Sequence, residues 1–341
     1  MSIQIRSVAL LLSVLMLTAC AVANTGGSGA KAPAAETGLF GRKHAELNVE
    51  TEKAFKGHNQ VIIGSFKVGF LEETKTSAKA GGGLLGNGFG GKSLALVSLA
   101  GVGSAEMQAI TDAAYADFLT QLQTQGYTVL DRNQLLSHAK FAKANADDAP
   151  IEIKSDAGKM LYFVPTELGN KAYFYMQDGI RSKGGFGFGN PSVATSVFAD
   201  ETGIRVLAVN YIIDFATAES YGAKHTSTSS VNVYQGISVK PGSQVALIGG
   251  SQGTFSTVNG SVSLGQPIYS TEKFGELTDV TSTAFKTTQV VTNVVSALGG
   301  LGTNKTSKYE VQADPAKYSS VTGGVLAKTN LAITEQMASV R

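Results

Sequence analysis

The first folded stretches of the chain show alternating apolar and polar positions, the pattern typical of β-strands. In residues 61–71, Phe66 and Phe70 share one face of such a pattern, which predicts a strand. Residues 93–100 predict a second strand of the same kind. A glycine-rich loop over 81–91 is expected to join the two strands.

Helical spacing follows the second strand. Apolar residues from Met107 to Leu122 repeat on one face, and Ser104 precedes them in a position suited to a helix cap. Gly126 can close the helix in the left-handed conformation. Shorter elements come next: a strand at 127–130, a helix capped by Asn133 that carries Leu135, Leu136 and Phe141, a polar loop at 145–158, strands at 160–164 and 172–176, and a glycine loop at 184–189.

The remainder of the chain is richer in strand patterns. Residues 204–215 are almost continuously apolar, which favours a strand buried on both faces. Residues 274–298 have apolar positions at helical spacing and predict a helix, although their many Thr and Val residues disfavour one. The other predicted elements are a strand at 231–239, a turn at Pro241-Gly242, paired strands at 245–248 and 255–264, and a final helix over 318–337 that begins after Asp314-Pro315.

These elements predict an α+β fold in which helices pack on a mixed or antiparallel sheet. We expect an α+β domain over residues 51–200 and a β-rich region with C-terminal helices over residues 201–341. Residues 20–50 are rich in Ala, Gly, Thr and Ser without apolar periodicity, and predict a flexible tether. Residues 1–19 have the charged start and apolar core of an export signal.

Charge and composition narrow the classes of function. The chain has 28 basic and 26 acidic residues, and removal of residues 1–19 takes away only Arg6, so the mature protein is nearly neutral. Such a balance gives no electrostatic basis for binding nucleic acid. Charged residues make up 16% of the chain and 40 residues are glycine, a composition similar to that of outer-membrane and extracellular β-proteins.

Cys20 is the single cysteine, and it ends the run Leu17-Thr18-Ala19-Cys20. This run resembles the lipobox of bacterial lipoproteins, which implies lipidation of the Cys20 thiol, cleavage before it, and a membrane anchor as partner. By the same resemblance Ala21, in place of an aspartate, indicates the outer membrane, with the domain facing the periplasm. Two alternatives remain: cleavage after Ala21-Val22-Ala23, which would release a soluble protein starting at Asn24, and an uncleaved anchor, for which the apolar run is short.

Three patterns suggest chemistry but lack the context that the chemistry requires. Gly86 to Ser93 matches the phosphate-binding loop, yet the following residues favour a strand where a helix must begin. Gly249-Gly250-Ser251-Gln252-Gly253 matches the nucleophile elbow, but no histidine follows it, since the last is His225. The other three histidines are His44, His58 and His138. The four are scattered along the chain and do not have the spacing of metal ligands. We therefore expect no nucleotide, cofactor, metal or catalytic site.

Asp131-Arg132 follows the predicted strand at 127–130 and could form a catalytic pair. Such residues more often cap the next helix or form a structural ion pair. The preceding helix, its glycine, the apolar strand and this Asp-Arg pair together resemble the periplasmic domain of the curli-export channel lipoproteins. The resemblance covers residues 61–136 and the lipobox, and this chain departs from the family in its long glycine loops and β-rich second half.

The resemblance implies a non-enzymatic protein that assembles as a ring at the outer membrane and helps to export or assemble surface polymers. Homo-oligomers or other envelope proteins would then be its partners. Residues 231–264 could supply membrane-inserted hairpins, or they could form an ordinary sheet. The alternatives to this function are a soluble secreted or surface structural protein and a periplasmic enzyme.

Overall fold

The computed structural model describes residues 21–37, 42–80, 91–155, 158–179, 187–221, 229–250, 259–284, 286–289 and 303–341. Helices pack on a mixed sheet, so the fold class is α+β, as predicted. The strands are β1 (Ala21–Ala30), β2 (Leu47–Glu50), β3 (Gln60–Ala80), β4 (Gly91–Ala100), β5 (Thr128–Val129), β6 (Asp147–Asp148), β7 (Ile151–Ser155), β8 (Gly158–Phe163), β9 (Lys171–Ala172), β10 (Arg205–Tyr221), β11 (Ser229–Val239), β12 (Gln244–Ile248), β13 (Gly260–Leu264), β14 (Ile268–Ser270), β15 (Gly275–Asp279) and β16 (Thr303–Ala313). The helices are η2 (Glu52–Ala54), α2 (Ser104–Thr124), α3 (Asn133–Leu136), η3 (Phe141–Lys143), η4 (Thr166–Leu168), η5 (Met176–Asp178), α4 (Pro191–Thr202) and α6 (Pro315–Ser339).

Two long strands form the centre of the sheet. β3 and β10 pair in parallel, with Arg205 opposite Val61 and Ile213 opposite Phe70. Both strands are buried over this stretch, as the apolar run at 204–215 predicted. The two halves of the sequence therefore contribute neighbouring strands to one sheet, and the boundary expected at residue 200 does not separate two sheets.

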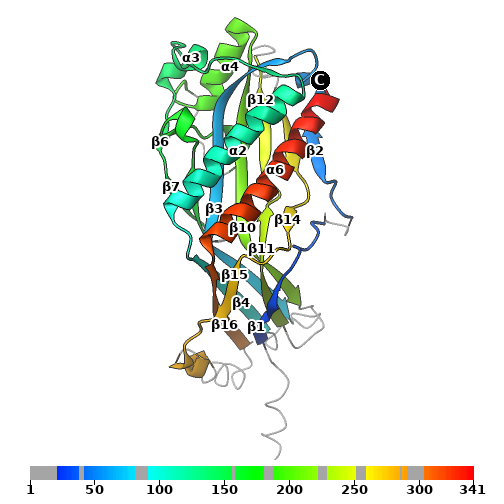
Figure 1. Cartoon of the computed structure of the whole chain (residues 1–341), viewed down its shortest axis with the longest axis vertical. Helices are drawn as coiled ribbons and strands as arrows, with labels where there is room; N and C mark the ends of the chain where they lie inside the picture. Colours follow the sequence, from blue (N-terminus) through cyan, green and yellow to red (C-terminus); the bar gives the residue numbers. More distant parts are fainter. Residues whose placement is uncertain are drawn as a thin grey trace, which may run out of the picture.

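Helices α2 and α6 lie side by side across one face of the sheet (Figure 1). The main core fills the space between them and the sheet, and it includes Phe66, Phe118 and Tyr211. A second core lies on the opposite face, where Phe198 of α4 and Leu135 of α3 pack on β10 and β12. This double cover explains why the central strands are apolar on both faces.

Both long helices have recognisable ends. Gly126 has φ +79° after α2, as predicted, but the N-cap residue of α2 is Gly103, and Ser104 is its first helical residue. The Glu106 carboxylate accepts a hydrogen bond from the Gly103 N–H at 3.0 Å, which stabilises this end. In α6, Asp314 is the N-cap and its side chain accepts from the Lys317 N–H, as the Asp-Pro start predicted.

The lower parts of six strands project from the helices at the end of the molecule opposite α3 and α4 (Figure 1). We call this part the strand extension, and it comprises residues 21–30, 72–80, 91–98, 216–221, 229–235 and 303–309. The remaining sheet and its helices are called the body. Burial alternates along residues 72–78 of β3, which indicates one covered and one exposed face in the extension.

Several predicted elements differ from the structure. Residues 20–50 do not form a continuous tether, since they contain β1 and β2. The predicted loop at 145–158 contains β7, which pairs with β8, and the expected strand at 172–176 is reduced to β9 and the start of η5. The glycine loop at 81–91 lies outside the described residues up to position 90, as does the loop at 184–189 up to position 186.

The helix predicted over 274–298 is the largest error. Its first residues form β15, which pairs antiparallel with β16 from Gly275↔Ala313 to Asp279↔Tyr309. Helical residues occur only later, at 283, 284 and 286–289, and residues 290–298 lie outside the described part. Pairing with β16 outweighs the helical spacing of the apolar residues, in agreement with the low helix propensity of this Thr- and Val-rich stretch.

Candidate functional site

The free end of the strand extension is the first candidate site. The registers Ala80↔Gly91, Thr303↔Gly91 and Ala21↔Ser229 bring the ends of several strands together there. Cys20 lies outside the described residues, but its covalent neighbour Ala21 begins β1 at this end. The predicted lipidation site therefore directly precedes a strand, and we call this end of the molecule the Ala21 end.

A cluster of polar side chains lies on the surface of the extension. The Lys31 ammonium donates to the Glu219 carboxylate, and the hydroxyls of Tyr221 and Tyr234 each donate to the same carboxylate at 3.1 Å. The hydrogen bond from Lys31 is the main cause that lowers the pKa of Glu219. Because Lys31 follows β1 directly, this cluster connects β1 to the β10–β11 hairpin.

The phosphate-loop pattern ends inside the strand extension. Lys92 and Ser93 belong to β4, where a phosphate-binding loop would require the first turn of a helix. The Ser93 hydroxyl is buried and donates to the Ser229 carbonyl at 2.9 Å. Ser93 thus connects two strands of the extension, while residues 86–90 lie outside the described part.

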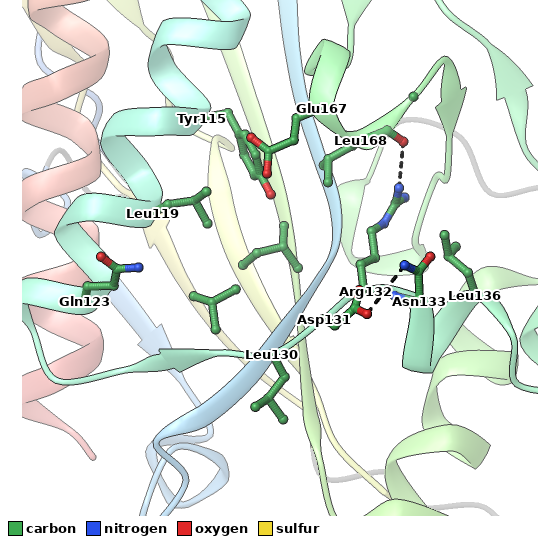
Figure 2. Close-up of a pocket in the computed structure, with 13 residues that line it drawn as sticks. Tyr115, Leu119, Gln123, Leu130, Asp131, Arg132, Asn133, Leu136, Glu167 and Leu168 are labelled. Atoms are coloured by element: carbon green, nitrogen blue, oxygen red, sulfur yellow. Dashed lines mark hydrogen bonds between the residues drawn. The ribbon is translucent and has the colours of Figure 1, made fainter.

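A groove of about 520 Å³ in the body is the second candidate site (Figure 2). One wall is helix α2, which contributes Tyr115, Leu119 and Gln123, and the other side is formed by Glu167 and Leu168 of η4. The groove also contains Asp131 and Arg132, which lie between β5 and α3, together with Ile63, Val129, Leu130, Asn133, Leu136 and Gly169.

Arg132 acts as a structural clamp in this groove. Its Nη1 donates to the Leu168 carbonyl at 2.7 Å and its Nη2 donates to the Gly64 carbonyl at 3.0 Å. Gly64 lies at an irregularity in the β3–β10 register, and a Cβ there would meet Val206 Cγ1 at 2.5 Å. The guanidinium therefore satisfies the carbonyl of a strand position that only glycine can occupy.

Asp131 has a different role from its neighbour. Its carboxylate accepts from the Asn133 N–H at 2.9 Å, so Asp131 supplies the hydrogen bond at the start of α3 that was expected from Asn133 (Figure 2). Asp131 thus precedes the N-cap residue of α3, which is Arg132, and its side chain bonds to the first turn of the helix. Arg132 is bound to backbone carbonyls in place of an ion-pair partner.

A polar contact beside the groove joins helix α2 to η4. The Asp112 carboxylate of α2 accepts from both the N–H and the hydroxyl of Thr166, at 2.7 and 2.9 Å, which fixes η4 to α2. Burial, with a smaller contribution from Glu167, raises the pKa of Tyr115 to about 12. The lining residues, all within the described part of the chain, include no serine, cysteine or histidine.

A buried ion pair lies on the other face of β3. Lys67 Nζ is 3.0 Å from Asp178 Oδ2, and both side chains are fully buried. Lys67 also donates to the Ser65 hydroxyl at 2.8 Å and to the Tyr173 carbonyl at 3.0 Å. Burial lowers the pKa of Lys67 and raises the pKa of Asp178, while their mutual attraction opposes both shifts.

Sequence reasoning missed this pair. Lys67 was visible as the one charged residue within the apolar strand 61–71, which is a signal of either an exposed position or a buried partner. Nothing in the sequence around Asp178 identifies it as that partner. The pair joins β3 to the segment before α4, and its complete burial makes it structural.

The other sequence candidates are not brought together. His58 Nε2 accepts from Arg205, His138 Nε2 pairs with Glu201 at 2.9 Å, and His225 lies outside the described residues. Within the described ranges, no group of three His, Cys, Asp or Glu side chains could hold a metal ion. Ser251 of the nucleophile-elbow pattern also lies outside them, and the preceding Gly250 packs against Asp200.

Residues 231–264, considered as membrane hairpins, contribute mainly to the body. β12 and β13 within this range pair with each other and are almost entirely buried, and only the first part of β11 belongs to the strand extension. In the part of the chain that the structure describes, no helix combines the length and apolar character needed to cross a membrane.

Comparison of the chain with family models, with curated proteins and with solved structures found no match. The resemblance of residues 61–136 to export-channel lipoproteins therefore stays a prediction from the residues themselves.

Proposed function

We propose that this chain is a non-enzymatic lipoprotein of the outer membrane, anchored through Cys20, that acts in envelope assembly or in secretion of surface polymers as a subunit of a ring. The observation that carries the proposal is the position of Ala21. A lipid on the residue before it would attach the protein at the Ala21 end, where the ends of several strands meet. The body, with its groove, would then stand away from the bilayer.

The β1 ladder favours Cys20 over Asn24 as the first mature residue. Ala21, Val22 and Ala23 are paired with residues Ser229, Ser230 and Val231 of β11. Cleavage before Asn24 would remove these three positions and leave the start of β11 without a partner on that side. Since strand pairs satisfy backbone groups that otherwise need other partners, the longer mature chain gives the more complete sheet.

The contacts in the groove support a binding role over an enzymatic one. Arg132 and Asp131 are engaged in hydrogen bonds that hold the surrounding backbone, and the lining also includes the aliphatic residues Leu119, Leu130 and Leu136. A surface of this kind fits a neighbouring subunit or a protein partner. The ring itself rests on the resemblance of residues 61–136.

The experiment has two parts. Mass spectrometry of the mature protein should find a diacylglyceryl-modified Cys20 as the first residue, and Cys20→Ser should abolish lipidation and outer-membrane retention. An unmodified chain beginning at Asn24 would contradict the anchor. Native mass spectrometry of the detergent-extracted protein should then find a closed oligomer, and a protein that remains monomeric at all concentrations would contradict the ring.

A further inference from the structure

Positive charge in the strand extension is concentrated in one group of its strands. The extension parts of β10, β11 and β1 contain a single charged residue, Glu219, which pairs with Lys31 directly after β1. The other group, β3, β4 and β16, has five lysines and no acidic residue over residues 74–80, 91–97 and 303–309. These lysines are Lys75, Lys79, Lys92, Lys305 and Lys308. The chain as a whole is nearly neutral, so this excess is local.

The strand registers place these lysines at two heights. Lys92 is the second residue of β4 and Lys305 is the third residue of β16, so both lie near the Ala21 end, and we call them the lower lysines. Lys75 and Lys308, the upper lysines, both lie opposite Leu96. Since a strand rises about 3.3 Å per residue, the upper lysines are about 13 Å further from the Ala21 end than Lys92. Lys305 is partly exposed, and the other three are exposed.

The start of β1 lies beside the lower lysines. Ala21 is paired with Ser229, and the carbonyl of Ser229 accepts a hydrogen bond from the Ser93 hydroxyl at 2.9 Å. Ser93 follows one lower lysine in β4 and is paired with the other in β16. In addition, β1 lies against both β4 and β16 (Figure 1). Cys20 is the covalent neighbour of Ala21, so a lipid on Cys20 would bring the lower lysines to the membrane surface.

The lower lysines have no acidic partner within the described part of the protein. Neither Lys92 nor Lys305 forms an ion pair with another described residue. Lys79 stands opposite Lys92 in the β3–β4 register, and like charges directly across a sheet destabilise it. Anionic headgroups can offset this repulsion, and their attraction for lysines falls off within about 8 Å at physiological salt. In an anchored copy the lower lysines are within this range and the upper lysines are beyond it.

We propose that Lys92 and Lys305 form a basic rim that binds the phosphate groups of anionic phospholipids in the leaflet that holds the Cys20 lipid. The inference rests on the proposed function, since the anchor brings the rim to the membrane. A lipid on Cys20 retains the protein but leaves its tilt free, because it is attached at one point. The rim adds a second point of contact and holds the strand extension in one orientation on the bilayer.

The test uses the mature chain, residues 20–341, carrying Cys20→Ser, so that no acyl chain drives the binding. Sedimentation measures its binding to phosphatidylcholine vesicles with and without phosphatidylglycerol. Phosphatidylglycerol should tighten binding at least about tenfold, and added salt should reverse this gain. Adding Lys92→Gln/Lys305→Gln should weaken binding to the anionic vesicles by about tenfold or more, because each lysine near an anionic surface contributes about fivefold.

The matched control is Lys75→Gln/Lys308→Gln, which removes the same charge from the same group of strands at the upper height. It should change binding by less than about twofold, since these lysines lie beyond the range of the headgroups. A second measurement needs no lysine variant. In the lipidated protein reconstituted in the two kinds of vesicle, phosphatidylglycerol should slow labelling of the Lys92 amine by an amine-reactive reagent and leave labelling of Lys75 unchanged.

Equal binding to neutral and anionic vesicles, or an equal loss in the two double variants, would overturn the rim. Competition by inorganic phosphate at matched ionic strength would show a site for a small anion and would overturn the membrane surface as the partner. Failure of the proposed function looks different, because an absent lipid on Cys20 is found by mass alone. Vesicle binding of the Cys20→Ser chain does not depend on that lipid and still reports on the rim.

Discussion

The body and the strand extension share the same strands but differ in what covers them. Residues 61–71 of β3 are buried throughout, because α2 and α6 lie on one face and the α3–α4 layer on the other. Residues 72–78 of the same strand alternate between exposed and covered positions. The body is thus stabilised by three hydrophobic clusters, while the extension depends on strand pairing and on small buried side chains, such as Ala95 and Val97, at the end of the largest cluster. We therefore expect the body to keep its structure when it is perturbed, and the strand extension to rearrange more readily.

The largest effect is expected from breaking the buried ion pair of the body. Asp178→Ala leaves the Lys67 ammonium buried without its partner, and should lower the free energy of unfolding by about 3–5 kcal/mol. Denaturant unfolding measures this loss. Lys67→Met combined with Asp178→Leu should recover most of it, because neither charge is then buried.

The matched control is the exposed pair of Lys171 and Asp148, whose side chains are 2.7 Å apart and mostly exposed. Lys171→Met should leave the free energy of unfolding nearly unchanged, since solvent screens such pairs. Equal losses for the buried and exposed pairs would contradict the difference in dielectric environment that the burial implies.

A smaller loss is expected from the clamp in the groove. Arg132→Met removes the donors to the Leu168 and Gly64 carbonyls and should destabilise the protein by about 1–3 kcal/mol. Asp131→Asn, which retains an oxygen acceptor for the start of α3, serves as the neighbouring control and should cost less than about 1 kcal/mol. A larger loss for Asp131→Asn than for Arg132→Met would show that the helix cap outweighs the clamp.

In the strand extension, Val97→Ala should have a more local consequence. Val97 of β4 is buried and belongs to the main core, and its truncation should cost about 1–2 kcal/mol. Hydrogen exchange should accelerate in β4 and β16 more than in α2 or α6. Equal acceleration in the body would mean that the two regions open as one unit.

The smallest expected effect concerns pH. Burial, and secondly the nearby charge of Arg205, lowers the pKa of His58, whose Nε2 accepts a hydrogen bond from Arg205. The unfolded chain then binds more protons below the ordinary histidine pKa, so the free energy of unfolding falls as the pH falls below about 6.5. His58→Gln should lose less stability between about pH 7.5 and about pH 5.5 than the unchanged protein. An identical pH dependence in the two proteins would exclude His58 as its source.

Local signals in the sequence were sufficient to predict the elements whose ends are marked by nearby residues. Helix α6 begins at Asp314-Pro315 as predicted, Gly126 follows the end of α2 with a positive φ, and the apolar run at 204–215 lies in the central strand β10. The same local rules were less accurate about which residue acts as a cap. Gly103 and Arg132 are the N-cap residues in place of Ser104 and Asn133, because the cap depends on how the chain enters the helix.

Long-range pairing decided the parts that local signals could not. Residues 275–279 lie in a stretch with helical spacing, yet they form a strand because they pair with β16. Residues 21–30 have the composition of a tether, yet they form a strand because they pair with β11. Arg132 and the Lys67–Asp178 pair were ambiguous for the same reason, since their partners are 36 to 111 positions away along the chain.

The sequence by itself determined the α+β class, the two long helices and the predicted lipidation signal at Cys20, because periodicity, caps and export signals are properties of contiguous residues. Only the tertiary structure decided that the two halves share one sheet and that Arg132 is a clamp. Each of these depends on backbone hydrogen-bonding groups that must find partners, and a partner distant in the chain leaves no trace in the local pattern.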